Sequence, residues 1–109
     1  MECLDKKILG WVKENGMNAN KETTYLDVWV WLLEEKRIYI YVTADCDDWY
    51  YNEFEVSIFV HKKTYKDSIV EPTALDRVYS SPLDAIKAAI NWLYDSAYDV
   101  NYHVNSVVG

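Results

Sequence analysis

Cysteine, glycine and proline are scarce in this chain of 109 residues, which has two, three and two of them. Two cysteines, Cys3 and Cys46, do not make the disulfide framework of a small secreted domain. So few glycines leave no glycine-rich loop for binding phosphates. The sequence also has no apolar run of the ~20 residues that a membrane span needs. Acidic residues stand near the N-terminus where a secretory signal would be basic, so we expect a soluble, cytoplasmic protein.

Basic residues are also few: the chain has 11 of them and 18 acidic residues, which gives a net charge of −7. Proteins that bind phosphate backbones present a basic face, so direct binding of nucleic acid is not expected. Residues 25–59 hold eight acids and two bases, and therefore −6 of the total. The one basic cluster ends a predicted strand, where such residues commonly discourage strand pairing: His61, Lys62, Lys63 and Lys66.

Apolar and aromatic residues, in contrast, are abundant, at 50% and 16% of the chain, which favours a folded domain over disorder. The length fits a single domain, residues 1–109. A first helix is predicted over residues 2–15, with an apolar stripe and a stop at Asn15-Gly16. Another is predicted over residues 81–97, because Ser81 can cap it and Pro82 fits its first position.

Alternating apolar residues predict strands over residues 24–33, 37–44 and 52–61. The aliphatic residues take even positions in all three, so one face of the sheet is expected to be aliphatic. A hairpin loop at residues 34–36 would keep that face continuous and place Leu32 near Ile38 and Trp31 near Tyr39.

The later part of the chain is harder to assign. A fourth strand is predicted at either Ile69-Val70 or Leu75–Tyr79, and residues 99–108 form either a fifth, edge strand or a loose end. Together the elements predict an α+β fold, a two-layer sandwich in the order α-β-β-β-(β)-α. The N-terminal and C-terminal helices would cover one face of an antiparallel sheet of three to five strands.

The other face of this predicted sheet would be aromatic, with six residues: Tyr25, Trp29, Trp31, Tyr39, Tyr41 and Phe59. So much exposed aromatic surface is typical of a protein interface. A covering tail or linker, the strand propensity of aromatic residues, or a self-dimer would also explain it.

A second candidate surface is the acidic, aromatic stretch that follows the second predicted strand. Residues 45–55 contain five acids and no base. Acids steer a basic partner toward a surface, and aromatic side chains supply short-range affinity. The alternative is an ordinary solvated loop that keeps the protein soluble. The residues expected to bind a partner here are Asp45, Asp47, Asp48, Trp49, Tyr50, Tyr51, Glu53 and Glu55, and on the aromatic face Trp29, Trp31, Tyr39 and Tyr41.

Catalysis and metal binding find little support in the sequence. The stretch that begins Asp45–Asp48 lacks the internal glycine of a calcium loop, and its aromatic residues do not fit that pattern. No cysteine or histidine pair has zinc-ligand spacing. Aspartates beside Cys46 disfavour its thiolate. No cofactor or enzymatic activity is therefore expected.

These observations predict a small acidic inhibitor that binds a basic, nucleic-acid-acting protein and occludes its phosphate groove, as phage anti-defence proteins of the anti-CRISPR type do. A toxin-neutralising immunity protein would present the same kind of surface. Two further alternatives are a homo-oligomeric interaction module that uses the aromatic face, and a ligand-binding domain or small enzyme that stacks its ligand there.

Overall fold

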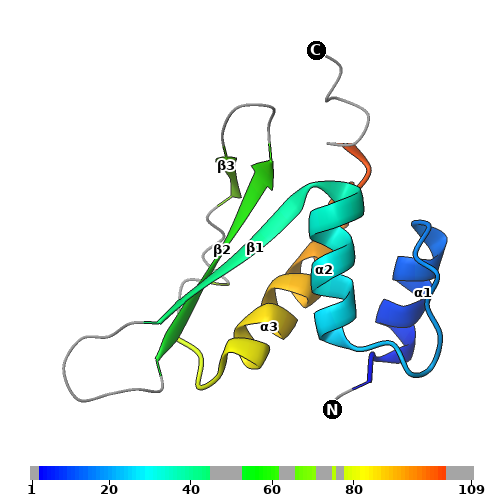
Figure 1. Cartoon of the computed structure of the whole chain (residues 1–109), viewed down its shortest axis with the longest axis horizontal. Helices are drawn as coiled ribbons and strands as arrows, with labels where there is room; N and C mark the ends of the chain where they lie inside the picture. Colours follow the sequence, from blue (N-terminus) through cyan, green and yellow to red (C-terminus); the bar gives the residue numbers. More distant parts are fainter. Residues whose placement is uncertain (1–2, 45–52, 62–65, 71–74, 76–77, 103–109) are drawn as a thin grey trace.

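Three helices and a small antiparallel sheet make up the computed structural model, which describes residues 3–44, 53–61, 66–70, 75 and 78–102 (Figure 1). The elements in chain order are α1 (Lys6–Glu14), α2 (Tyr25–Lys36), β1 (Ile38–Ala44), β2 (Phe54–His61), β3 (Lys66–Val70) and α3 (Pro82–Asp95). The α+β class is confirmed. The predicted order is wrong, because the chain runs α-α-β-β-β-α.

The segment predicted as the first strand is helix α2. Thr24 caps this helix: its hydroxyl accepts a hydrogen bond from the Asp27 backbone N–H, and the Asp27 carboxylate accepts one from the Thr24 backbone N–H. This reciprocal pair is a capping box. Arg37 ends the helix in the left-handed conformation, with φ of 61°, and β1 begins at the next residue. The expected hairpin with a loop at residues 34–36 therefore does not exist.

Strands β1, β2 and β3 lie side by side in that order, with antiparallel pairing. Ile40 lies opposite Ile58 and Val42 opposite Val56, so the even-numbered aliphatic residues share one face as the alternation predicts. Tyr79 adds an isolated bridge to Phe54. Of the candidate fourth strand at Leu75–Tyr79, the structure describes residues 75, 78 and 79, and of these Tyr79 forms the bridge; Ile69-Val70 belongs to β3.

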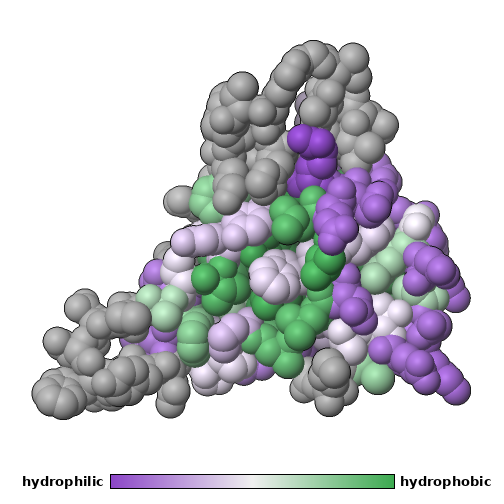
Figure 2. Space-filling model, in the orientation of Figure 1, coloured by the Kyte–Doolittle hydropathy of each residue, from purple (hydrophilic) through white to green (hydrophobic). Residues whose placement is uncertain are grey.

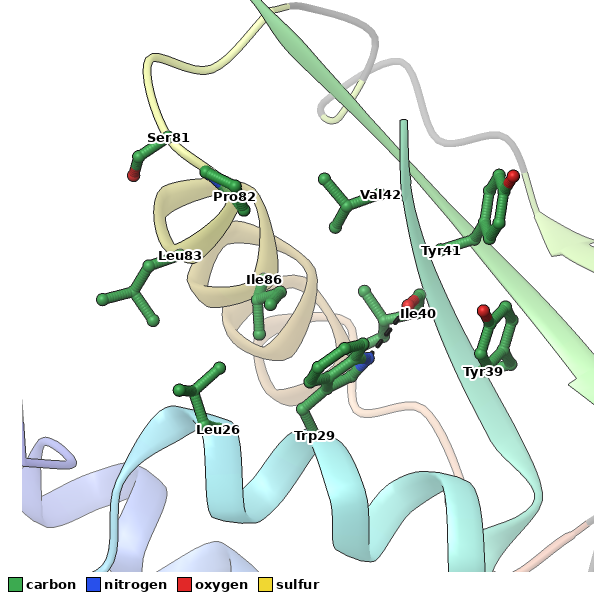
Figure 3. A pocket seen from close by; sticks show the side chains of 10 residues that line it. All are labelled: Leu26, Trp29, Tyr39, Ile40, Tyr41, Val42, Ser81, Pro82, Leu83 and Ile86. Carbon is green, nitrogen blue, oxygen red and sulfur yellow. Dashed lines mark hydrogen bonds between the residues drawn. The ribbon is translucent and has the colours of Figure 1, made fainter. Parts of the chain in front are cut away.

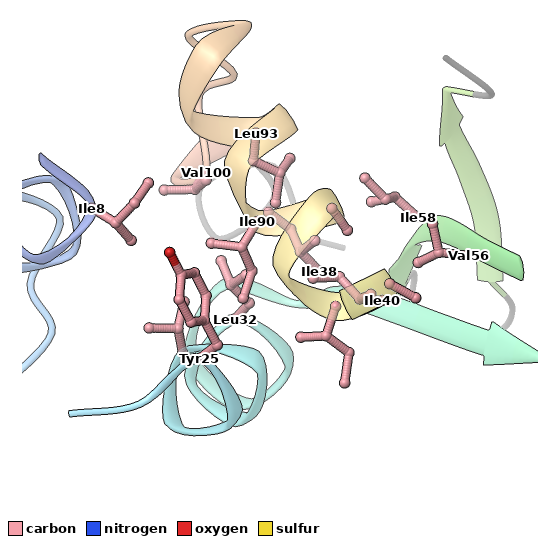
Figure 4. Close-up of a cluster of buried hydrophobic side chains, with 14 of the residues drawn as sticks. Ile8, Tyr25, Leu32, Ile38, Ile40, Val56, Ile58, Ile90, Leu93 and Val100 are labelled. Atoms are coloured by element: carbon pink, nitrogen blue, oxygen red, sulfur yellow. The ribbon is translucent and has the colours of Figure 1, made fainter. Parts of the chain in front are cut away.

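Helices α2 and α3 cover the aliphatic face of the sheet, with α2 against β1 and α3 against both β1 and β2 (Figure 1). Helix α1 packs against α3, on the side away from the sheet. The expectation that the N-terminal helix covers the sheet is therefore wrong, and α2 takes that place. Fully buried side chains from all three helices and both long strands form one core (Figure 4): Ile8, Leu32, Ile38, Ile40, Ile58, Ile90 and Leu93.

The segment after α3 returns to the core at Val100, which is 1% exposed. Asn101 ties this segment to two helix ends, since its amide nitrogen donates to Asn15 Oδ1 and its Oδ1 accepts from Lys36 Nζ. Burial raises the pKa of the Tyr98 phenol, and Asp99 and Tyr102 add to the rise. Residues 99–102 are a turn, and the rest of the predicted tail lies outside the described residues.

Two helices end in the same hydrogen-bond pattern, although their residues differ. After α1, Met17 N–H donates to Val12 O at 2.9 Å and Gly16, with φ of 99°, occupies the left-handed position. After α3, Tyr98 N–H donates to Leu93 O at 3.1 Å and Ala97, with φ of 55°, occupies it. Both are Schellman motifs, in which glycine is the favoured residue at this position.

Replacing Ala97 by glycine and Gly16 by alanine should change the stability of the protein in opposite directions. We expect Ala97→Gly to raise the free energy of unfolding by about 1 kcal/mol, because glycine adopts a positive φ without a Cβ clash. Gly16→Ala should lower it by about 1 kcal/mol through the backbone alone, since a Cβ at Gly16 would meet no atom within 4 Å. Urea unfolding of both variants measures this, and changes of equal sign would contradict it.

Candidate protein-binding surface

One face of the sheet points away from the helices and is here named the outer sheet face. On β1 and β2 it includes six odd-numbered residues, Tyr39, Tyr41, Thr43, Glu55, Ser57 and Phe59, and Glu53 comes just before β2 in the same alternation. The face continues toward β3, where His61 of β2 pairs with Lys66. Figure 3 shows Tyr39 and Tyr41 on the side of β1 opposite to the helices. Four of the predicted contact residues are therefore brought together here: Tyr39, Tyr41, Glu53 and Glu55.

Three aromatic rings pack against one another on the outer sheet face. The centroids of Tyr39 and Tyr41 are 5.8 Å apart, and Tyr41 meets Phe59 edge-on at 6.2 Å with an angle of 83°. Such contacts contribute about 0.5–1.5 kcal/mol each beyond their buried area. Tyr41 nevertheless remains 43% exposed. The rings are thus held in place by their neighbours while one of them stays accessible.

Acidic charge lies at one end of this face. Glu55 is exposed and lies opposite Thr43 in the β1–β2 pair, and Glu53 comes just before the strand. The basic residues His61 and Lys66 pair across β2 and β3 at the opposite end of the sheet. The connection from β1 to β2 starts at the end with Glu55, and its sequence adds three aspartates and no base. The predicted contact residues Asp45, Asp47, Asp48, Trp49, Tyr50 and Tyr51 lie outside the described residues.

Three aromatic residues predicted for this face lie elsewhere, because α2 is a helix. Tyr25 is buried in the core, at 3% exposure. Trp29 faces β1 and donates from Nε1 to the Ile40 carbonyl at 2.9 Å. Trp31 lies near the end of α2, where Lys36 Nζ sits 5.3 Å from its ring centroid. The prediction that Trp29 and Trp31 share one sheet face with Tyr39 and Tyr41 is therefore wrong, although Trp29, Tyr39 and Tyr41 all line the groove between α2, β1 and α3.

An apolar groove that the sequence reading missed lies between α2, β1 and the start of α3 (Figure 3). Its volume is about 510 Å³, and its apolar lining includes Leu26, Trp29, Ile40, Val42, Leu83 and Ile86. Figure 2 shows hydrophobic residues gathered over this part of the molecule. The sequence feature that could have predicted this groove is a second apolar stripe on α2, beside the buried one and at helical spacing: Leu26, Trp29, Val30 and Leu33.

Within the described ranges, the structure shows neither a metal cluster nor a membrane-spanning helix. No group of three or more histidine, cysteine, aspartate or glutamate side chains in these ranges is placed to hold a metal ion. Within the same ranges, no helix has the length and hydropathy of a membrane span. A small polar pocket is lined by Cys3, Asp5, Tyr25, Lys87 and Asn91, with Lys87 Nζ 5.4 Å from the Tyr25 ring centroid.

Comparisons of the sequence and structure with protein-family models, curated proteins and solved structures found no match. The outer sheet face and the apolar groove are therefore the two surfaces from which a function can be inferred.

Proposed function

We propose that this protein is a small acidic inhibitor that binds a basic, nucleic-acid-acting protein through its outer sheet face and occludes the partner's phosphate-binding groove. The observation that carries the proposal is the packed ring cluster of Tyr39, Tyr41 and Phe59, with Glu53 and Glu55 at one end of the same face and the pair His61–Lys66 at the opposite end.

The two kinds of side chain have separate tasks in this proposal. Carboxylates act at long range: they attract a basic surface and raise the association rate, and salt weakens the effect. Tyrosine rings act at contact, where they bury large area at a low entropic cost. Rings already packed against one another lose little further freedom on binding. An acidic face of this kind competes for the same lysines and arginines that bind phosphates.

A toxin-neutralising immunity protein remains the alternative with the same surface, because many toxins that act on nucleic acids are also basic. A self-dimer through the outer sheet face is a further alternative, in which two copies that each carry a net charge of −7 would meet. Light scattering on the purified protein tests for a self-dimer before any partner is sought.

The first experiment is affinity capture with tagged protein and two charge-reversed variants. Glu53→Lys/Glu55→Lys reverses the charge of the outer sheet face. Glu14→Lys/Glu22→Lys makes the same change in net charge at exposed positions at the end of α1 and after it, away from the sheet. We expect wild type and the Glu14/Glu22 variant to retain a basic nucleic-acid-acting protein, and the Glu53/Glu55 variant to lose it.

The same capture is repeated at higher salt and with Tyr41→Ser. The proposal predicts that salt weakens retention and that Tyr41→Ser lowers affinity by about tenfold, as loss of an interface tyrosine commonly does. Equal retention by both charge-reversed variants, or equal loss, would contradict a specific role for the outer sheet face.

A further inference from the structure

Strand β1 pairs with β2 along one edge, and hydrogen bonds show which of its backbone groups point toward the other edge. Phe54 and Tyr79 exchange both backbone hydrogen bonds, at 2.9 and 2.8 Å, so the Phe54 N–H and C=O point away from β1. Phe54 lies opposite Ala44. In an antiparallel pair such residues form the non-hydrogen-bonded sites, which recur at every second position. Val42 and Ile40 are at these positions too, so their N–H and C=O groups point outward, away from β2.

Trp29 confirms this orientation independently. Its Nε1 donates to the Ile40 carbonyl from the α2 side, at 2.9 Å (Figure 3). One outward carbonyl of the edge is therefore occupied. In the described part of the chain, β1 has β2 as its strand neighbour and nothing on its other edge at Val42. An edge of this kind is a template for another strand.

The apolar groove runs beside this edge. Val42 and Ile40 form one wall, while Leu26 and Leu83 lie across from them on α2 and α3 (Figure 3). Leu26 is 39% exposed, and Val30, on the same stripe of α2, is 46% exposed. A strand added to β1 would place every second side chain on the groove side, and the others beside Tyr41 on the outer sheet face.

We propose that the β1 edge and the apolar groove together bind an extended segment of a partner protein, with alternating apolar and basic residues, as an added strand. Its backbone would pair with Val42, its apolar side chains would fill the groove, and its basic side chains would extend along the outer sheet face. Strand addition gains affinity from main-chain hydrogen bonds and specificity from pockets for alternate side chains.

Charge decides between a basic segment and a second copy of this chain. The exposed acids Asp27 and Asp84 directly follow Leu26 and Leu83 at the groove, and Glu55 lies on the neighbouring strand. The residues that line the groove include no base. A second copy, with net charge −7, would bring acid against acid, whereas lysines or arginines in the bound segment would be attracted. This inference does not rest on the proposed inhibition, because the edge could bind such a segment from any partner.

The test uses labelled peptides of alternating valine and lysine, read by fluorescence anisotropy. Two N-methylated forms, methylated on the valines or on the lysines, each lose half of the backbone donors. In an antiparallel added strand, the residue opposite Val42 has its side chain on the groove side, and its N–H bonds to β1. If valines take the groove side, methylation of the valines should weaken binding at least about tenfold. Methylation of the lysines, whose N–H groups point away from β1, should not weaken it. A parallel strand would reverse the two results. A peptide of alternating valine and glutamate should not bind.

Two variants at Val42 test the edge from the protein side. Val42→Pro removes the outward N–H without taking a hydrogen bond from the β1–β2 ladder, so the sheet should persist. Val42→Ala shortens the side chain and keeps the N–H. We expect at least about tenfold weaker peptide binding with Val42→Pro and a small change with Val42→Ala, with circular dichroism confirming that both fold. If Val42→Pro does not fold, the comparison of the two N-methylated peptides decides.

Several results would overturn the inference. These are no binding of the valine–lysine peptide, equal binding of the two N-methylated forms, and equal binding of the peptide to wild type and to folded Val42→Pro. A wild-type dimer that Val42→Pro converts to a monomer would show that a second copy occupies the edge instead. Capture experiments with Glu53→Lys/Glu55→Lys test the outer sheet face separately, so failure of one proposal leaves the other standing.

Discussion

Val30→Pro should lower the free energy of unfolding by about 3 kcal/mol or more. Val30 lies in the middle of α2, where proline removes a backbone hydrogen bond and its ring clashes with the preceding turn. The Val30 side chain is 46% exposed, so most of the loss comes from the backbone. Urea unfolding, followed by circular dichroism, measures the change. A domain of ordinary stability, about 5–15 kcal/mol, would lose a large part of it.

Val30→Ala is the matched control for this substitution. Alanine is the better helix former by several tenths of a kcal/mol, which offsets the small area that the exposed valine buries. We therefore expect stability within about 0.5 kcal/mol of wild type. If residues 24–33 were an edge strand, Val30→Ala would lower stability by up to about 1 kcal/mol, and Val30→Pro at an outward-facing N–H would cost much less than in a helix. That pattern would contradict the assignment of α2.

Tyr25→Ala should destabilise the protein by about 3–5 kcal/mol, as removal of a large buried aromatic side chain does. Tyr25 is 3% exposed at the start of α2, within the core that includes Ile8 and Leu32 (Figure 4). Tyr41→Ala serves as the comparison, since Tyr41 is 43% exposed on the outer sheet face. Its expected cost is about 1 kcal/mol, from lost contacts with Tyr39 and Phe59.

Chemical denaturation of the two tyrosine variants, compared with wild type, measures this contrast. Similar losses for both would place Tyr25 on an exposed sheet face, as a strand over residues 24–33 would require. A much larger loss for Tyr25→Ala supports the helix and its place in the core.

The segments that could be predicted from the sequence are those with one clear period. Strict alternation in β1 and β2 gives both strands and the even-numbered aliphatic face. Ser81 and Pro82 mark the start of α3, and Ser81 does cap it. In α2, by contrast, Asp27 is the one polar residue among the first nine, so apolar residues fit a period of two as well as 3.6. The Thr24–Asp27 capping box was the local signal that favours the helix.

The period of the apolar residues also determines which parts of the candidate surfaces could be predicted. Tyr39, Tyr41, Glu53 and Glu55 share a face because alternation within strands fixes which residues point together. Trp29 and Trp31 could be placed correctly only with α2 as a helix. The apolar groove and the β1 edge depend on how α2 and α3 pack against the sheet, which periodicity does not determine.

Occlusion is the central claim, and competition with nucleic acid tests it most directly. The captured partner would be loaded with a labelled oligonucleotide, and this protein would be added while fluorescence anisotropy is followed. The account predicts that wild type and Glu14→Lys/Glu22→Lys displace the oligonucleotide and that Glu53→Lys/Glu55→Lys does not. A stable ternary complex of partner, oligonucleotide and wild-type protein would contradict it.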